Sequence, residues 1–597
     1  MVYVKRLRLL SAAAIILCMT GISGQALDQL DFQVKSDDGT LKSDLRAASG
    51  LVAAQSSKRT DAQDLVADAR AEYGKLIGAL YASGHYSPVI HVIVDGREAA
   101  DIAPLDAPTT IRKIVVTVDP GPVFRFSRAE ISPVAPHTEL PTDFAKGAVA
   151  ESGLVIQAVQ SGIDGWRNLG FAKARVAGRN LVADHADATL NASIAIDHGP
   201  RLRFGPLTVT GNGRMSVARV LAIAGLPEGE RFDPADAERS ARRLRRSGVF
   251  SSVSLTENDQ ITKPDLLGFN AELVEARPHR YTFGAEIASA DGAKLTGSWL
   301  HRNLLGGGER FEVLGEVSGI GAQTGGRDYS LGVTLDRPAT PWPDTELNLG
   351  AKISRVDEVD TTAKLATISG GFTQYFGDTL TAQAAMAFAA SDGFDAASTY
   401  SFRSLQLPIG ATWDRRDSAT EPTKLFYLDA EAKPFYGFGN TDNGLRLSFD
   451  GRAYKGSGDN RVIFAGRVQG GAVLGADILK TPRDDLFYSG GGGTVRGQVY
   501  QSLGVTVNDG GTAVHIGGNQ FLAGSLEARL KVTEKIGVVG FADIGLVGLN
   551  GGNSDWQAGA GLGLRYATPV GPVRLDLALP VHSGSGLQVY VGLGQAF

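Results

Sequence analysis

The sequence predicts small α+β domains followed by an all-β transmembrane barrel of 16 antiparallel strands. Two observations carry this expectation. From Arg280 onward, long segments alternate apolar and small or polar residues between turns, as do barrel strands that face lipid on one side and the lumen on the other. Before Pro278, helical patterns that close on a glycine are each followed by strand patterns, which indicates small domains in series.

The first residues are typical of a secretory signal peptide. A basic start precedes a short apolar run over 9–19, and small residues near 24–26 offer a cleavage site, so we expect a signal peptide over 1–26. The apolar run is shorter than the roughly 20 residues that a membrane-spanning helix needs. Cys18 is the one cysteine; after cleavage the chain would have no thiol chemistry.

Composition excludes several classes of function. A formal net charge of -5 gives no support for a nucleic-acid partner. The nine histidines show no metal-ligand spacing, and no soft ligand accompanies them. No catalytic set of residues is evident. We therefore expect a protein that is not an enzyme and holds no cofactor or metal.

Three helical patterns end on Gly84, Gly170 and Gly248. Each glycine suits the position after a helix, where a left-handed backbone is needed. Strand patterns follow them, at 89–94, 188–196 and 270–274.

The third copy is the clearest. It predicts a strand at 207–209, helices at 217–224 and 234–246, and strands at 253–255 and 269–274. This β-α-α-β-β order resembles a polypeptide-transport-associated (POTRA) domain. We divide the N-terminal half into three such domains, at 27–121, 122–200 and 201–277.

A basic run lies on the second predicted helix of that third domain. Its arginines are Arg242, Arg243, Arg245 and Arg246. They suit either a partner or membrane surface or a solvated helix face, and we favour the solvated face.

The barrel is expected to span 278–597, with an even number of strands as in single-chain bacterial barrels. Closure matters because an unpaired backbone group in lipid costs several kcal/mol. The alternative, a secreted soluble all-β protein, predicts shorter strands. The expected strands lie near 280–290, 293–302, 309–319, 327–336, 344–356, 362–375, 379–391, 401–414, 425–435, 444–455, 460–475, 520–533, 536–547, 556–567, 570–580 and 586–597.

The last strand has a pattern of its own. Leu587, Val589, Val591 and Leu593 share one face, and Phe597 ends the sequence. An alternating apolar segment with a terminal aromatic is similar to the assembly signal of outer-membrane proteins.

The longest gap between expected strands, 477–519, contains a glycine run and the tripeptide Val495-Arg496-Gly497. Together with Asp414–Asp417 and a C-terminal segment over 559–576, this set resembles the superfamily of outer-membrane barrel-assembly and two-partner secretion proteins. The family signature places an aromatic residue after the glycine. Here Gln498 holds that position, and Tyr500 is the candidate to replace the aromatic.

Within a barrel, the arginine of this loop needs a carboxylate, and its guanidinium can pair bidentately. Glu527 and Asp543 lie on successive expected strands, and Phe541 belongs to the same motif. We expect Arg496 to be clasped inside the lumen by one of these carboxylates. The alternative is an arginine exposed on an outer loop.

Three POTRA domains and 16 strands resemble the TamA branch of the superfamily. The resemblance implies an outer membrane location with POTRA domains in the periplasm, a TamB-like periplasmic partner, unfolded outer-membrane client proteins and contact with outer-membrane lipids. It also implies a lateral seam between the first and last strands, which we expect Gly586, Gly592 and Gly594 to weaken near Phe597. The rivals are a two-partner-secretion pore, which an irregular segment near 56–61 would favour if it were a plug, a general barrel-assembly protein, and a surface adhesin.

Overall fold

The computed structural model describes most of the chain, and the expected signal peptide lies outside the described residues. The described ranges are 29–59, 61–103, 106–262, 264–289, 291–322, 325–358, 361–569, 571–582, 586–595 and 597. Two compact units divide the chain, with residues 1–203 and 231–234 in the first and 204–230 and 235–597 in the second. Within the described residues, no helix has both the length and the apolarity to cross a membrane.

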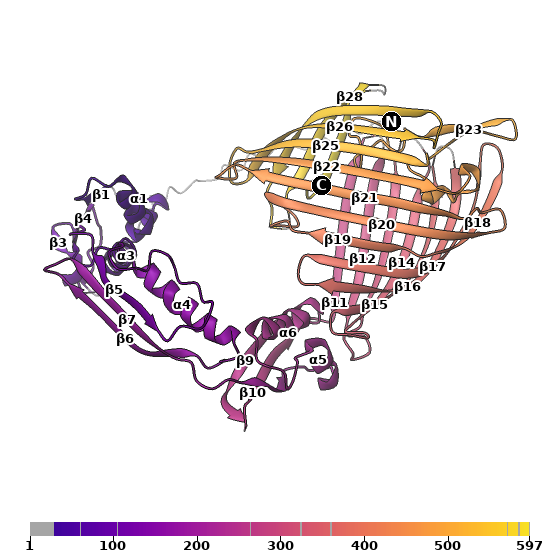
Figure 1. Ribbon diagram of the computed structural model, residues 1–597. Helices are drawn as coiled ribbons and strands as arrows, with labels where there is room; N and C mark the ends of the chain where they lie inside the picture. Colours follow the sequence, from indigo (N-terminus) through magenta and orange to yellow (C-terminus); the bar gives the residue numbers. More distant parts are fainter. Residues whose placement is uncertain are drawn as a thin grey trace, which may run out of the picture. The chain divides into compact units, whose positions relative to one another are not determined.

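The first unit begins with a four-stranded sheet in the order β1-β4-β2-β3 (Figure 1). Leu45, Leu51, Leu65 and Leu76 bring its helices into one apolar core. The segment near 56–61, expected to be irregular, is exposed at its described residues: it ends α2 and leads to Asp61, which caps α3. The elements are β1 (Gln29–Val34), α1 (Gly39–Ala48), α2 (Gly50–Ser56), α3 (Ala62–Ala82), β2 (Val89–Val94), β3 (Arg97–Glu98), the 3-10 turn η1 (Ala99–Asp101) and β4 (Lys113–Asp119).

A second sheet follows in the same unit, in the order β5-β7-β6. Its strands are β5 (Arg125–Ser132), β6 (Arg175–Asp184) and β7 (Thr189–Asp197), and α4 (Ser152–Asn168) packs on it. Gly84, just beyond α3, has a φ of 78°, and its carbonyl accepts a hydrogen bond from the nitrogen of Phe124 at 2.8 Å. The glycine thus ends one helix and ties the first sheet to the second.

A third sheet, in the order β8-β10-β9, carries two helices. Helix α5 ends on Gly225, which has a φ of 55°. The observed order is the β-α-α-β-β order that the sequence predicts, and both helices have the predicted bounds. The elements are β8 (Arg203–Thr210), α5 (Val217–Ala224), α6 (Pro234–Arg246), β9 (Phe250–Thr262) and β10 (Leu266–Glu275).

Most of the basic run on α6 faces the barrel and not solvent, which corrects our interpretation; Arg245 alone of the four stays half exposed and pairs with Glu238. Arg243 and Arg246 both bind Asp344, at 2.5 and 2.9 Å, in the turn between β14 and β15. Arg242 lies 3.2 Å from Asp378 in the next turn of the same side. The arginines therefore hold α6 against the barrel within the second unit, a contact that helical periodicity alone does not reveal.

The barrel is closed and antiparallel, with 16 membrane-spanning strands among the described residues. One of these strands is interrupted near Pro408 and consists of β18 and β19, because β17 and β20 each pair with both. The strands are β11 (His279–Ala288), β12 (Gly292–Arg302), β13 (Arg310–Ile320), β14 (Asp328–Pro338), β15 (Thr345–Asp357), β16 (Thr361–Phe376), β17 (Leu380–Asp395), β18 (Thr399–Gln406), β19 (Ile409–Asp414), β20 (Lys424–Phe438), β21 (Gly444–Gly456), β22 (Val462–Leu474), β25 (Gln520–Lys531), β26 (Ile536–Gly548), β27 (Ser554–Tyr566), β28 (Val573–His582) and β29 (Gln588–Leu593).

Two parts of the barrel differ from the expectation. The long loop after β22 contains two 3-10 turns, η3 (Ile478–Lys480) and η4 (Arg483–Asp485), and a hairpin, β23 (Val505–Asp509) and β24 (Thr512–Ile516). The closing strand β29 stops at Leu593 instead of continuing to Phe597.

Candidate functional site

The loop between β22 and β25 runs into the lumen and brings Arg496 against the inner wall. Gly490 and Gly491 have φ values of 113° and 82°, a region that favours glycine. The hydroxyl of Thr494 accepts a hydrogen bond from the nitrogen of Gly490 at 2.8 Å and donates to its carbonyl at 3.1 Å. These contacts fold the glycine run into a compact tip that presents the next residues to the wall.

Glycine also lets this tip approach the wall closely. Gly497 has a φ of 93°, and a Cβ there would lie 2.7 Å from the carbonyl oxygen of Leu579. On the wall, a Cβ at Gly559 would lie 1.9 Å from the carbonyl oxygen of Arg496. Both positions exclude a side chain, so loop and wall meet backbone to backbone.

Arg496 is 3% exposed and contacts both predicted carboxylates. Its Nε and Nη2 donate to the two oxygens of Asp543 at 2.7 and 2.9 Å, and its Nη1 donates to Glu527 at 2.6 Å. The guanidinium carbon lies 3.6 Å from the ring centre of Phe541. Neighbouring Val495 is fully buried. Ion pairing, bidentate hydrogen bonding and a cation–π contact thus all hold the side chain of Arg496 in place.

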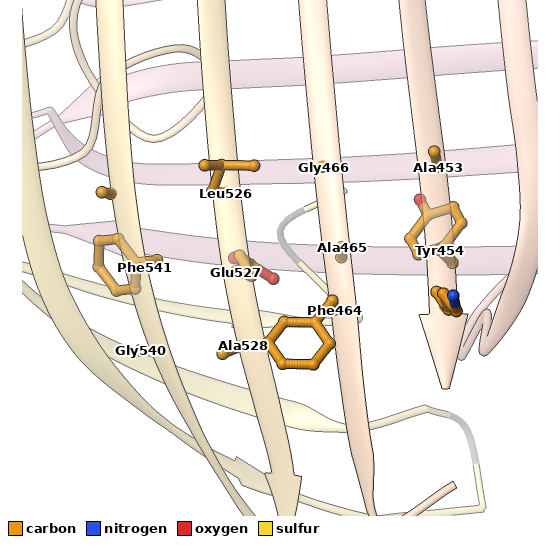
Figure 2. Close-up of a pocket in the computed structure, with 12 residues that line it drawn as sticks. Ala453, Tyr454, Phe464, Ala465, Gly466, Leu526, Glu527, Ala528, Gly540 and Phe541 are labelled. Atoms are coloured by element: carbon orange, nitrogen blue, oxygen red, sulfur yellow. The ribbon is translucent and has the colours of Figure 1, made fainter. Parts of the chain in front are cut away.

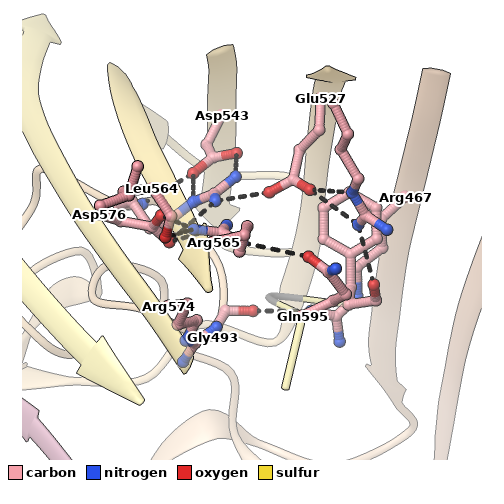
Figure 3. A network of polar contacts seen from close by, with 12 residues as sticks. Arg467, Gly493, Glu527, Asp543, Leu564, Arg565, Arg574, Asp576 and Gln595 are labelled. Carbon is pink, nitrogen blue, oxygen red and sulfur yellow. Dashed lines mark hydrogen bonds and ion pairs between the residues drawn. The ribbon is translucent and has the colours of Figure 1, made fainter. Parts of the chain in front are cut away.

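The network around Arg496 is larger than the motif predicted (Figure 3). Asp576 lies 3.6 Å from Arg496 and also binds Arg565. Arg529 binds the second oxygen of Glu527 at 2.8 Å. Three arginines therefore face three carboxylates, which balances the charge of this buried cluster. Asp576, Arg565 and Arg529 were not predicted as partners of the loop arginine. The signal that could have found them is their position on the inward-facing side of alternating strands.

The residue after the glycine of the motif, Gln498, is polar and binds the barrel wall. Gln498 donates to the carbonyl oxygens of Ala558 and His582 at 2.9 and 3.1 Å. Tyr500 is half exposed, so it does not replace the missing aromatic. Instead, the hydroxyl of Tyr590 on β29 accepts a hydrogen bond from the nitrogen of Gly497 at 3.2 Å. This links the loop directly to the closing strand.

The other motif residues and the wall around Glu527 complete the picture. Asp414 binds Arg416 at 2.7 Å, where β19 ends. A hollow of roughly 530 Å³ runs along four adjacent strands, and Figure 2 shows residues that line it. Tyr454, Ala465, Glu527 and Phe541 lie side by side in register along these strands and are among its lining residues.

The seam between β11 and β29 is short. The register pairs Ile287 with Val591 and Ala288 with Tyr590. Beyond these pairs, the nitrogen of Ser289 donates to the carbonyl of Val589 at 3.0 Å. The earlier part of β11, residues 279–286, has no strand paired on this side among the described residues.

Side chains add further links across this seam. Arg574 on β28 binds Glu286 on β11, which bridges the gap inside the barrel. Ser289 donates to Gln588 at 2.8 Å. The seam is thus held by a few contacts near one end. The remaining neighbouring strands of the barrel are joined by longer ladders of backbone pairs.

The seam glycines do not all lie where the sequence placed them. Gly592 is inside β29, but Gly586 precedes the strand and Gly594 follows it, with φ values of 74° and 93°. Phe597 is buried inside the barrel, against Tyr454 and Ala465. It therefore does not continue the lipid-facing row of β29, as the assembly-signal pattern predicted, because the chain turns inward after Leu593.

With this geometry in view, the chain can be compared with known proteins. Residues 303–597 match the Omp85 superfamily domain. The chain is also similar to the outer membrane protein assembly factor BamA of Nitratidesulfovibrio vulgaris, with 23% identity over 466 residues, 73% of this chain and 56% of that protein. The chain thus spans about half the length of this curated relative. The protein has its barrel in the outer membrane and its N-terminal domains in the periplasm.

Solved structures share the fold at low identity. Haemophilus ducreyi BamA lacking POTRA domains 1–3 superposes with a TM-score of 0.61 at 15% identity, covering 79% of this chain and all of that chain. CdiB from Acinetobacter baumannii superposes with a TM-score of 0.51 at 11% identity, covering 80% of this chain and 90% of that one.

Proposed function

We propose that the protein assembles client β-barrel proteins in the outer membrane through the seam between β11 and β29. The observation that carries the proposal is the free edge of β11 over 279–286, next to a seam with two register pairs. An unpaired strand edge is a template for another strand. A client strand that pairs with β11 would form hydrogen bonds with these backbone groups. The client strand would then lie next to lipid as it forms.

The side chains of the free edge fit such a role. Tyr281 and Phe283 are 65% and 81% exposed on the outer face of β11. A client strand that pairs here would place its own lipid-facing residues beside them, in the alternation that barrel strands share. Outer-membrane lipids are therefore the surroundings in which the edge acts.

We further propose that the N-terminal sheets are POTRA domains and that the protein resembles TamA, with a TamB-like periplasmic partner. Strand β6 pairs with β7 on one side and has no strand on its other side among the described residues. Its Leu181 and Val182 are exposed. An extended segment of the partner would add to such an edge by β-augmentation.

A disulfide across the seam tests the proposal. Across the seam, the register pairs Val591 with Ile287. The variant I287C/V591C should therefore crosslink on oxidation and stop client insertion, and reduction should restore it. A matched control is V333C/A351C, a pair in register between β14 and β15 away from the seam, which should leave insertion unchanged.

The opposite result favours the alternative function. If the locked seam inserts clients at the normal rate, lateral opening is wrong. Passage through the lumen, as in a two-partner-secretion pore, then becomes the better account, and the fold shared with CdiB is compatible with it.

A further inference from the structure

The last residues of the sequence turn back into the barrel and reach strands far from β29. Phe597 is 7% exposed and packs against Tyr454 on β21 and Ala465 on β22. These strands are separated from β29 by β25, β26, β27 and β28 in the barrel order. The end of the sequence therefore lies in the barrel interior instead of extending β29 along the wall.

One arginine fixes Phe597 in this place. Nη2 of Arg529 donates to the backbone oxygen of Phe597 at 3.1 Å, and its guanidinium carbon lies 5.4 Å from the ring centre. The same guanidinium lies 5.7 Å from the ring centre of Tyr454. Arg529 thus stands between two rings and contacts the backbone, a fork geometry that lysine does not reproduce.

Arg529 also belongs to the clasp around the loop arginine. Its Nε donates to one oxygen of Glu527 at 2.8 Å, while Arg496 binds the other oxygen at 2.6 Å. A second connection runs in parallel: Nε of Arg565 donates to Gln595 at 3.1 Å, and Arg565 shares Asp576 with Arg496. Both contacts that hold the end of the sequence inward therefore come from partners of the clasp.

The same residues have another possible partner, the free edge of β11. In an antiparallel ladder each step along β29 moves one step back along β11. Continuing from Ile287 and Val591, Leu593 would face Ala285, and Phe597 would face Tyr281. In that arrangement the ring of Phe597 would point outward beside the exposed ring of Tyr281.

Gly594 is where the two arrangements diverge. Its φ of 93° turns the chain after Leu593, and this backbone region is open to glycine at little cost. A more extended conformation at the same residue would continue the strand along β11.

We propose that Arg529 is a positioning residue that couples the Arg496 clasp to the seam: it holds Phe597 in the lumen and so keeps the edge of β11 open. When Arg529 releases Phe597, the end of the sequence pairs with β11 and the free edge shortens. The consequence for client assembly rests on the proposed function. The two arrangements of the chain do not.

Disulfide trapping in purified full-length protein separates the two arrangements. The cysteine pair A285C/L593C reports pairing beyond the observed seam, and neither residue contacts the clasp. The pair I287C/V591C serves as the reference, because it is in register in both arrangements. We expect Arg529→Met to raise the trapping yield at 285/593 relative to the reference by about tenfold, as losing one hydrogen bond to a charged group shifts populations.

A matched variant controls for general loosening. Arg452→Met removes another luminal arginine, which binds Asp450 and touches neither Glu527 nor Phe597 in any contact among the described residues. It should leave the yield at 285/593 unchanged. If Arg529→Met fails to fold, Phe597→Ala provides the second test, since deleting the ring should release the same segment and raise the same yield.

Two outcomes overturn the proposal: an unchanged yield at 285/593 in folded Arg529→Met or Phe597→Ala, or an equal rise in Arg452→Met. Client insertion is measured separately in the same variants. A raised yield with normal insertion would retain the coupling and reject the proposed function, so the two failures are distinguishable.

Discussion

Asp543 binds Arg496 at three atoms: it accepts from the backbone nitrogen at 3.0 Å, from Nε at 2.7 Å and from Nη2 at 2.9 Å. One carboxylate therefore fixes both where the loop backbone lies and how its guanidinium is oriented. A single residue of β26 thus determines the position of a loop tip from more than 40 residues earlier in the sequence. Because the contact is buried, water cannot replace either partner.

Replacing Arg496 by alanine should free the loop tip and destabilise the barrel locally. The change leaves Asp543 and Glu527 buried without their shared cation, and removing one partner of a buried pair costs on the order of 3–5 kcal/mol. Limited proteolysis within 475–519 should become faster, and the folded band on unheated gels should be lost at a lower temperature. The double variant Arg496→Met with Asp543→Asn should be less affected than Arg496→Ala. Equal protease resistance in wild type and Arg496→Ala would contradict the clasp.

The docking of α6 on the barrel should be lost in acid. Hydrogen bonds from Arg243 and Arg246 lower the pKa of Asp344 from 3.8 to about 2. A carboxyl whose pKa is lower in the folded state contributes stability above its unfolded pKa, and this contribution is lost as the pH falls through the folded pKa. The contact should therefore persist at neutral pH and weaken between pH of about 4 and about 2. Its side chain is a quarter exposed, so solvent screening moderates the effect.

Hydrogen exchange of the α6 amides, corrected for the intrinsic rate at each pH, measures this loss. Asp344→Asn is the control: it lacks the titrating group, so exchange in α6 should be faster than wild type at neutral pH and show no step in acid. A wild-type protein whose α6 protection stays constant down to pH 2 would contradict the assignment.

Residues 201–277 should fold when expressed alone. Leu244 and Phe250 belong to a core formed largely within this segment, which predicts cooperative unfolding and mixed α/β circular dichroism. The same core also includes Ala339 from the barrel turn, and Arg219 donates to the carbonyl of Gly307 at 3.0 Å. The isolated segment should therefore be less stable than in the full chain. A disordered spectrum would count against the division at 201 and 277.

The sequence predicted the barrel and the partners of Arg496 because both leave periodic or local signals. Alternation marks strands wherever one face meets lipid, and the loop motif associates an arginine with carboxylates on two successive strands. The inward turn of Phe597 left no such signal. It depends on one backbone angle at Gly594, and the alternation of Val589, Val591 and Leu593 continues to predict an outward ring.

Contacts between distant elements were likewise beyond sequence reasoning. The basic run on α6 has the composition of a solvated face, and its acidic partner Asp344 is about 100 residues away. The hydroxyl of Tyr590 binds the nitrogen of Gly497 in the loop motif, yet this contact depends on which strands the closed barrel brings together.

The close approach of loop and wall gives a last prediction, Gly559→Ala. A Cβ at this position would lie 1.9 Å from the carbonyl oxygen of Arg496, a backbone atom that cannot rotate away. The loop tip must then move off the wall, which stretches the hydrogen bonds between Arg496 and Asp543, while the charges of the clasp remain intact. Proteolysis within 475–519 should accelerate as it does in Arg496→Ala, although no charged group has been removed.

Gly524→Ala is the matched control for this change. Gly524 also lies within a barrel strand, but a Cβ there would meet its nearest atom, in Ile544, at 3.7 Å, an ordinary contact. Alanine at this position should leave loop protection unchanged and should stabilise the strand, because glycine costs about 0.5–1 kcal/mol relative to alanine there. If Gly559→Ala protects the loop as well as Gly524→Ala does, the loop tip does not depend on backbone contact with β27, and the clasp is held by its charges alone.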